Sequence, residues 1–160
     1  MPTFVEHEAQ AASNIDFVNE IFKLSDNNGL RFPDWYATVC LYTAVHVIEA
    51  EIYQMPTIYY SYNGKPMALT GKIRHSSDFK LFLGRTTLPT SPHFYRRLVV
   101  DDSRNGFTEV VSAAYNSLYE YSCKARYECF KKCHKNVRRA REAIDKIVSF
   151  HKSRFESSLP

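Results

Sequence analysis

Residues 121–141 of this chain, YSCKARYECFKKCHKNVRRAR, bring together three kinds of side chain that can do chemistry. They hold three cysteines, one histidine and a run of lysines and arginines. Such a segment suits a metal site, a surface for nucleic acid, a nuclease active site or the solvated face of an ordinary helix. The spacing of these residues and the charge of the rest of the chain narrow the four interpretations.

The cysteines and the histidine lack the spacing of a zinc site. Cys129 and Cys133 lie one helical turn apart, but His134 points about 100° away from them on a helix of 3.6 residues per turn. Zinc needs four converging ligands, and no second Cys/His pair follows at zinc-finger spacing. The cysteines are therefore interpreted as reduced structural thiols. The chain also has no glycine-rich phosphate loop, and we expect no metal and no cofactor.

Positive charge gathers in the last quarter of the chain. Residues 1–120 carry ten Lys and Arg against thirteen Asp and Glu, whereas residues 121–160 carry eleven against four. Only Glu142 and Asp145 interrupt the positive residues between 131 and 146, so internal pairing cannot neutralise them. This imbalance suits RNA or a nucleotide, while a plain solvated face and an acidic protein partner stay open. The candidate phosphate contacts are Lys131, Lys132, Lys135, Arg138 and Arg139.

The elements that must position these residues are mainly helices. A first helix is expected over residues 3–24, with an apolar stripe of Phe4, Ala11, Ile15, Val18 and Phe22. Residues 33–54 are apolar on almost every face, which predicts the central helix of a bundle. A last helix is expected over residues 128–156. Its apolar or small positions repeat at alternating steps of three and four: Phe130, Cys133, Val137, Ala140, Ile144, Ile147 and His151.

The middle of the chain interrupts the helical pattern. The run TIYYSYNGKPMALTG at 57–71 predicts a β-hairpin that turns at Asn-Gly. A short helix through about Leu83 follows, and another helix begins at Pro92, breaks near 101–106 and resumes to about 121. The fold class is therefore an all-α, up-and-down bundle of four to five main helices, with a small β-hairpin insertion near residues 57–70, in one domain over 1–160.

The sequence shows no signal for a membrane or for secretion. No apolar run reaches the roughly 18 residues that span a bilayer. The first residues, MPTFVEHEAQ, lack the charged and then apolar order of a signal peptide. We therefore expect a cytoplasmic protein that has no membrane among its partners.

Two segments taken together resemble one branch of the HEPN superfamily. LYTAVHVIEAEI at 41–52 resembles that branch's fYaalHxxEAxl helix. YNSLYEYSCKARY at 115–127 resembles its YxxLxxxSxxARY segment, matching at Tyr115, Leu118, Ser122, Ala125, Arg126 and Tyr127. Trp35 and the acid before it fit the usual DW start. The order and spacing of these elements agree across residues 33–156.

The resemblance implies a helical bundle that forms a homodimer, often in toxin–antitoxin or antiphage loci, with an antitoxin or a larger effector as a partner protein. Many members are metal-independent ribonucleases whose Arg-x4-6-His motifs face each other across the dimer and cut RNA by in-line attack of the 2′-hydroxyl. In such an enzyme, Arg126 would stabilise the charge on the phosphorane and His134 or His46 would transfer protons. The further RNA contacts in the same groove would be Arg74, His75 and Tyr127.

The chain departs from that nuclease pattern in two places. No arginine is followed by a histidine after four to six residues, and the nearest pairs, Arg126 to His134 and Arg85 to His93, have seven residues between them. The branch usually carries HxxR in its central loop, where this chain has His75-Ser-Ser-Asp78. Two functions therefore stay open: an RNA-binding protein or ribonuclease, and a non-catalytic dimerisation or adaptor module that docks onto a partner protein.

Overall fold

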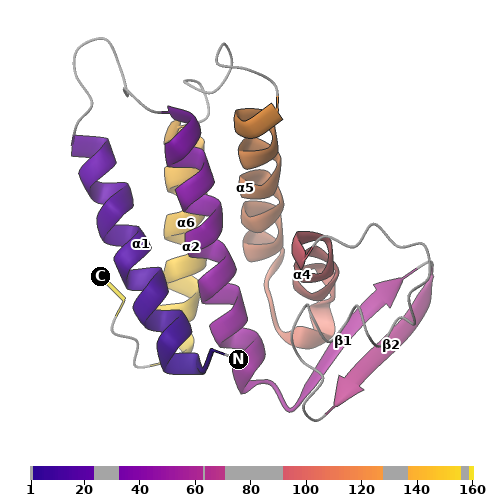
Figure 1. Ribbon diagram of the computed structural model, residues 1–160. Helices are drawn as coiled ribbons and strands as arrows, with labels where there is room; N and C mark the ends of the chain where they lie inside the picture. The colour runs from indigo at the N-terminus through magenta and orange to yellow at the C-terminus, as the bar shows by residue number, and fades with distance from the viewer. Residues whose placement is uncertain (1, 24–32, 63, 71–91, 128–136, 156–158) are drawn as a thin grey trace.

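The computed structural model describes residues 2–23, 33–62, 64–70, 92–127, 137–155 and 159–160. Within these residues, five helices pack together with a two-stranded antiparallel hairpin (Figure 1). The helices are α1 (Phe4–Lys23), α2 (Pro33–Gln54), α4 (Pro92–Asp101), α5 (Glu109–Tyr127) and α6 (Val137–Arg154). The hairpin consists of β1 (Thr57–Tyr62) and β2 (Lys65–Thr70), and one turn of 3-10 helix, η1 (Ser103–Asn105), separates α4 from α5. The fold class predicted from the sequence is confirmed.

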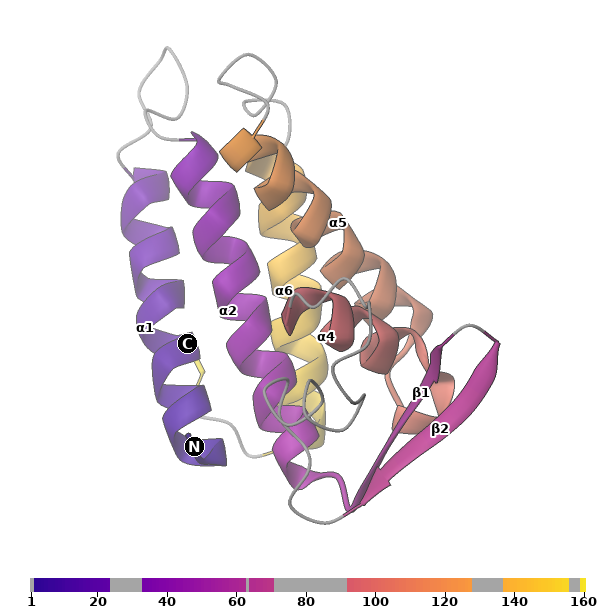
Figure 2. The same cartoon turned by 45° about the vertical axis from the view of Figure 1, so that its right-hand side comes forward.

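The central helix of the bundle is α2. It contacts α1, α4, α5 and α6, and its bounds are those expected from its apolar composition. Pro33 suits the first turn of a helix because its missing N–H would be unpaired there, and Asp34 is favoured by the positive end of the helix dipole. The shorter helix α4 packs against α5, α2 and β1, and the hairpin lies beyond it (Figure 2). Glu49, which α2 presents to α4, is therefore buried beneath a second layer.

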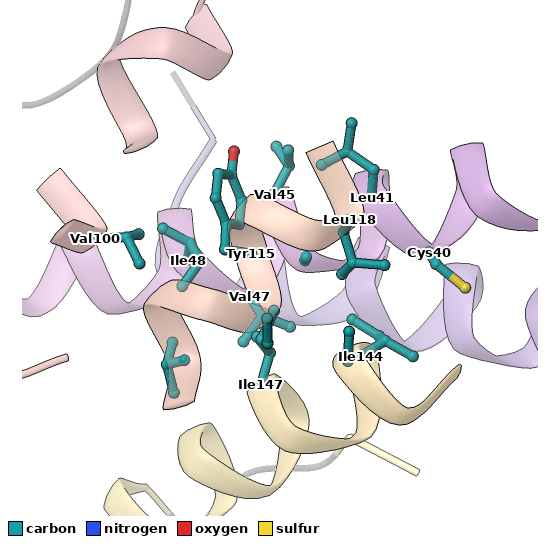
Figure 3. Packing of buried hydrophobic residues seen from close by; sticks show 14 of the residues in the cluster. Cys40, Leu41, Val45, Val47, Ile48, Val100, Tyr115, Leu118, Ile144 and Ile147 are labelled. Atoms are coloured by element: carbon teal, nitrogen blue, oxygen red, sulfur yellow. The ribbon is translucent and has the colours of Figure 1, made fainter. Parts of the chain in front are cut away.

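The core forms where α2, α5 and α6 meet. Figure 3 shows Leu41 and Ile48 of α2 packing with Leu118 of α5 and with Ile144 and Ile147 of α6, and all five side chains are buried. Full burial of one such side chain stabilises the folded state by about 1.5–3 kcal/mol. Apolar packing thus fixes the three helices relative to one another. It also fixes the positions of the polar groups on their other faces.

The apolar stripes predicted for α1 and α6 are buried at most of their described positions. On α6, the described members of the expected stripe are all buried: Val137, Ala140, Ile144, Ile147 and His151. On α1, Ala11, Ile15 and Val18 are buried as expected, whereas Phe22 is 47% exposed and Ile21 is buried in its place. Val18 is followed three residues later by Ile21 and four later by Phe22, so both lie near the stripe. Phe22 lies at its edge, with its ring 6.0 Å from that of Tyr36.

The break between α4 and α5 is tied to the hairpin. Asp102 caps η1 by accepting a hydrogen bond from the backbone N–H of Arg104, and Gly106 ends the turn at φ +77°, a conformation that favours glycine. The side chain of Asn105 accepts from the backbone N–H of Tyr59 at 2.8 Å and donates to its carbonyl at 2.6 Å. The predicted break near 101–106 is therefore confirmed.

Some expected boundaries differ or fall elsewhere. The expected end of α5 near residue 121 is wrong, because the helix continues to Tyr127 and carries Arg126 in its last turn. The apolar or small positions Leu118, Ser122 and Ala125 keep one side of this extension buried. The helix expected through Leu83 and residues 128–136 of the expected last helix lie outside the described residues. None of the described helices is long and apolar enough to cross a bilayer.

Candidate functional site

The residues expected at the site are only partly described. Arg126, His46, Arg138 and Arg139 are described with their side chains, and Tyr127 is described by its backbone. The remaining expected residues lie outside the described part of the chain: Arg74, His75, Lys131, Lys132, His134 and Lys135. The pairing of Arg126 with His134 therefore stays a prediction.

The basic residues of α6 point in different directions. Arg138 pairs with Glu142 across an Nε–Oε1 distance of 2.9 Å, and Arg141 pairs with Asp145 and donates to Asn19 at 2.5 Å. Both acids inside the run are thus paired with an arginine one turn earlier, which neutralises more of this segment than its composition suggested. Exposed pairs of this kind stabilise a helix by only about 0.3–0.5 kcal/mol.

Arg139 lies near Glu142 of this pairing, because both residues line the same groove. It lines an open groove of about 470 Å³ between α5 and α6, together with Lys146 of the same helix. The floor and rim of the groove also include Glu109, Ala113, Ala114, Tyr121 and Ala143. The described cations of α6 are therefore divided between a solvated face and a groove of mixed charge.

His46 makes a contact with α1. Its Nδ1 lies 3.1 Å from Nδ1 of His7, and the two rings are 5.4 Å apart between centroids. Burial lowers the pKa of His46, and the nearby charges of His7 and Arg96 lower it further. His46 is consequently one half of a histidine pair that joins α1 to α2.

The histidine on which the charge of Arg126 acts is His93, in the first turn of α4. Burial lowers the pKa of His93 to about 4, with further contributions from the positive charges of Arg96 and Arg126. Arg126 and Tyr119 are seven residues apart on α5 and therefore share one face of that helix. Side chains on a helix lean toward its N-terminus, and Nε of Arg126 accordingly donates to the backbone carbonyl of Ser122, one turn earlier, at 3.3 Å.

Aromatic rings surround His93 on two sides. The ring of Tyr42 lies 6.1 Å away in an edge-to-face arrangement, and the ring of Tyr119 lies 5.9 Å away. Nδ1 of His93 is buried and forms no hydrogen bond within the described part of the chain. We call Tyr42, His93, Arg96, Tyr119 and Arg126 the interhelical site, because α2, α4 and α5 each contribute to it.

A buried ion pair fixes α4 beneath this site. Nε of Arg96 lies 2.5 Å from Oε1 of Glu49, and the two residues are only 9% and 2% exposed. Burial raises the pKa of the neighbouring Tyr115, which stays protonated at neutral pH. Removing one partner of a buried pair costs about 3–5 kcal/mol, because a charge is left uncompensated. Glu49 therefore holds Arg96 in place one turn after His93.

A second arginine of α4 is held by a polar network. Nε of Arg97 donates to Oδ1 of Asn116 at 2.6 Å, and Nδ2 of Asn116 donates to Asp101 at 2.8 Å. The guanidinium of Arg97 also lies 5.0 Å from the centre of the Tyr119 ring. Arg97 thus fixes the ring that flanks His93.

A readable sequence signal marks this site. His93-Phe-Tyr-Arg96 has the HxxR spacing that is absent at His75-Ser-Ser-Asp78. The spacing of three places both side chains on one face of α4. The resemblance predicted this pattern in a loop, whereas His93 and Arg96 lie in the first turns of α4. No sequence spacing connects Tyr42 or Tyr119 to the pattern.

Another histidine, His151, lies in a buried cluster of opposite charge. It is fully buried, with Nδ1 2.8 Å from Oε1 of Glu51 and Nε2 3.0 Å from Oε1 of Glu8. Burial opposes protonation of His151, but the hydrogen bonds to Glu51 and Glu8 outweigh it and raise the pKa. Arg154 lies 3.3 Å from the second oxygen of Glu51. We call Glu8, Glu51 and His151 the buried cluster, with Arg154 at its exposed edge; it joins α1, α2 and α6.

Neither cluster is arranged as a metal centre within the described residues. Across the described ranges, no three His, Cys, Asp or Glu side chains are grouped so that they could hold a metal ion. Cys40 is a buried free thiol, and burial raises its pKa to about 12, so it is neutral and unreactive at pH 7. No protein-family model matches this chain, and neither a curated protein nor a solved structure does.

Proposed function

We propose that this protein binds RNA at the interhelical site and cleaves it without a metal ion, as a HEPN-like ribonuclease of a toxin or defence system. The observation that carries the proposal is that His93 is half-buried between the rings of Tyr42 and Tyr119, with the positive charges of Arg96 and Arg126 nearby. A permanent cation and a neutral base near the same point are what phosphodiester cleavage requires. The resemblance of residues 41–52 and 115–127 to the HEPN branch supports the same assignment.

The chemistry assigns one role to each group. Neutral His93 accepts the proton of the RNA 2′-hydroxyl as that oxygen attacks the adjacent phosphorus. Arg126 stabilises the additional negative charge on the phosphorane, and the departing 5′-oxygen takes a proton from water. The products are a 2′,3′-cyclic phosphate and a 5′-hydroxyl. Glu49 acts as a positioning residue because it holds Arg96 beside the base.

The low pKa of His93 is compatible with this role. In the free protein, two arginines disfavour a third positive charge at this point. A bound phosphate places negative charge beside the imidazole and offsets the arginines, so the basicity of His93 rises when substrate is present. The base is therefore weak in the empty site and stronger in the complex.

The proposal is tested by an RNA cleavage assay in excess EDTA. A labelled single-stranded RNA is incubated with the wild-type chain, with His93→Ala and with Arg126→Ala, and the cyclic phosphate product is measured. We expect both variants to lose at least about 100-fold in rate, the scale of one general base or one charge-stabilising contact. The matched control is Arg104→Ala, which removes an exposed arginine paired with Asp102 at η1. Equal rates for all four proteins would refute the assignment.

An adaptor function is the second candidate, and the α5–α6 groove favours it. Val110 is 55% exposed beside the small residues Ala113 and Ala114, and Arg139 and Glu142 supply charges of both signs. A helix of a partner protein or of a second copy would fit such a surface. If this is the function, Val110→Glu abolishes partner or dimer formation in light scattering, and the wild type shows no RNA binding at low salt.

A further inference from the structure

Tyr42 is one of three exposed aromatic residues on the largely buried central helix, at 42% exposure beside Trp35 at 65% and Tyr53 at 39%. The ring of Tyr42 lies against that of His93. An exposed aromatic ring on a core helix gains little from packing. Its place beside His93 suggests that its exposed surface has another use.

The rings at this point form a continuous series across three helices. Tyr42 of α2 contacts His93 of α4, His93 contacts Tyr119 of α5, and Arg97 lies over Tyr119. The edge-to-face contact with His93, at an interplanar angle of 69°, uses at most one face of the Tyr42 ring. The outermost member of the series thus presents aromatic surface to solvent.

We propose that Tyr42 is a stacking platform for an unpaired base, so that the interhelical site takes single-stranded RNA and excludes a duplex. This inference rests on the proposed function and names the substrate form at the same site. Bases in an A-form duplex are stacked on one another and cannot reach a side chain, whereas single-stranded bases stack on exposed aromatic rings. Because Tyr42 touches His93, a phosphate held at His93 brings the base of its own nucleotide to Tyr42.

The first test measures equilibrium binding by fluorescence anisotropy. The probes are a labelled 12-nucleotide single-stranded RNA and the matching 12-base-pair duplex. We expect Tyr42→Ala to weaken single-strand binding by about 5- to 150-fold, the scale of one base–aromatic stack, and Tyr42→Phe to bind like the wild type. Tyr53→Ala is the matched control, since Tyr53 lies eleven residues later on the same face of α2 and is 39% exposed.

A second arm separates stacking from general damage to the site. One nucleotide at a time is replaced by an abasic residue, which keeps the phosphate and removes the base. At one position the abasic RNA should lose as much affinity as Tyr42→Ala does, and the two changes together should cost no more than either alone. The thermal unfolding midpoint of Tyr42→Ala should stay close to that of the wild type, because Tyr42 is 42% exposed and lies outside the apolar core.

The outcomes distinguish this inference from the proposed function. If Arg126→Ala weakens RNA binding while Tyr42→Ala and the abasic probes change nothing, the stacking platform is refuted and the RNA site stands. Additive losses in the double-mutant cycle, or duplex binding equal to single-strand binding, also refute the platform. If the wild type binds neither probe at low salt, the proposed function fails and this inference fails with it.

Discussion

The interhelical site and the buried cluster each place a histidine among charged residues, with opposite results. Burial lowers the pKa of His93 to about 4, and the positive charges of Arg96 and Arg126 contribute to this fall. His151 is enclosed by Glu8 and Glu51, and its pKa is raised. One imidazole is therefore neutral at pH 7, whereas protonation of the other is easier than in a free histidine.

The difference indicates that the buried cluster has a structural role, whereas the interhelical site suits an anion. In the buried cluster, both nitrogens of His151 already have carboxylate partners, and a further ligand would find no vacant acceptor or donor on the ring. In the interhelical site, cations exceed anions and an exposed tyrosine adjoins the histidine. Excess positive charge next to exposed surface is the feature that an RNA phosphate needs.

The largest expected effect concerns stability. His151→Ala leaves two buried carboxylates without their shared partner, so we expect a loss of about 3–5 kcal/mol in the free energy of unfolding. His93→Ala removes a half-buried ring without stranding an opposite charge, and we expect a loss of about 1 kcal/mol. Urea denaturation of both variants measures the comparison. Similar losses would show that the two histidines are not distinguished by their partners.

The pH dependence of stability should also differ in sign. The folded pKa of His151 lies above the unfolded value of about 6.5, so its stabilisation is complete below pH 6.5 and disappears as the pH rises through the folded value. The folded pKa of His93 is lower than the unfolded one, so it destabilises the fold as the pH falls from 6.5 toward 4. Denaturation midpoints across pH 4–9 measure both slopes.

Two variants assign these slopes to individual residues. His151→Gln should flatten the decline above pH 6.5, and His93→Gln should flatten the decline below it. The account of the buried cluster is wrong if His151→Gln retains the alkaline slope of the wild type.

The sequence predicted the helices better than it predicted the site. The apolar faces of residues 33–54 and the three- and four-residue steps of Val137, Ala140 and Ile144 depend on local periodicity, which one chain displays directly. The α4–α5 break followed from Asp102 and Gly106, whose turn preferences are also local. These features can be predicted without knowing which helices pack against each other.

The clusters depend on contacts between distant residues. Glu8 and His151 are 143 residues apart, and Glu49 and Arg96 are 47 apart, so no spacing rule joins them. His151 occupied an apolar position in its helix and was indistinguishable from a packed residue. Arg126 was proposed because it belongs to a recognisable segment. His93 begins an HxxR pattern, but its place beside Tyr119 of α5 became visible only in the structure.

Bound RNA should change the pKa of only one of the two histidines. Addition of single-stranded RNA should raise the pKa of His93, because a phosphate offsets Arg96 and Arg126, and should leave that of His151 unchanged. An NMR titration of the imidazole carbon-bound protons with and without RNA measures both values. An equal change at both histidines would indicate a global effect of binding, and no change at His93 would remove it from the RNA site.

The smallest expected effect concerns the groove between α5 and α6. If RNA extends from the interhelical site to this groove, Arg139→Gln should reduce the dependence of log affinity on log salt by about 0.7, the contribution of one single-strand phosphate contact. Arg138→Gln, one residue earlier, is the control because Arg138 is paired with Glu142. Equal slopes for both variants would restrict the RNA path to α2, α4 and α5.

The most direct test of the account is the pKa of His93 in the free protein, measured by NMR in the wild type and in Arg126→Ala. His93→Gln identifies the resonance. The account predicts a wild-type value far below 6.5, near 4, and a higher value in Arg126→Ala, because one of the two arginine charges is removed. An unshifted wild-type value near 6.5, or a value that does not change when Arg126 is replaced, would contradict the claim that these two residues form one site.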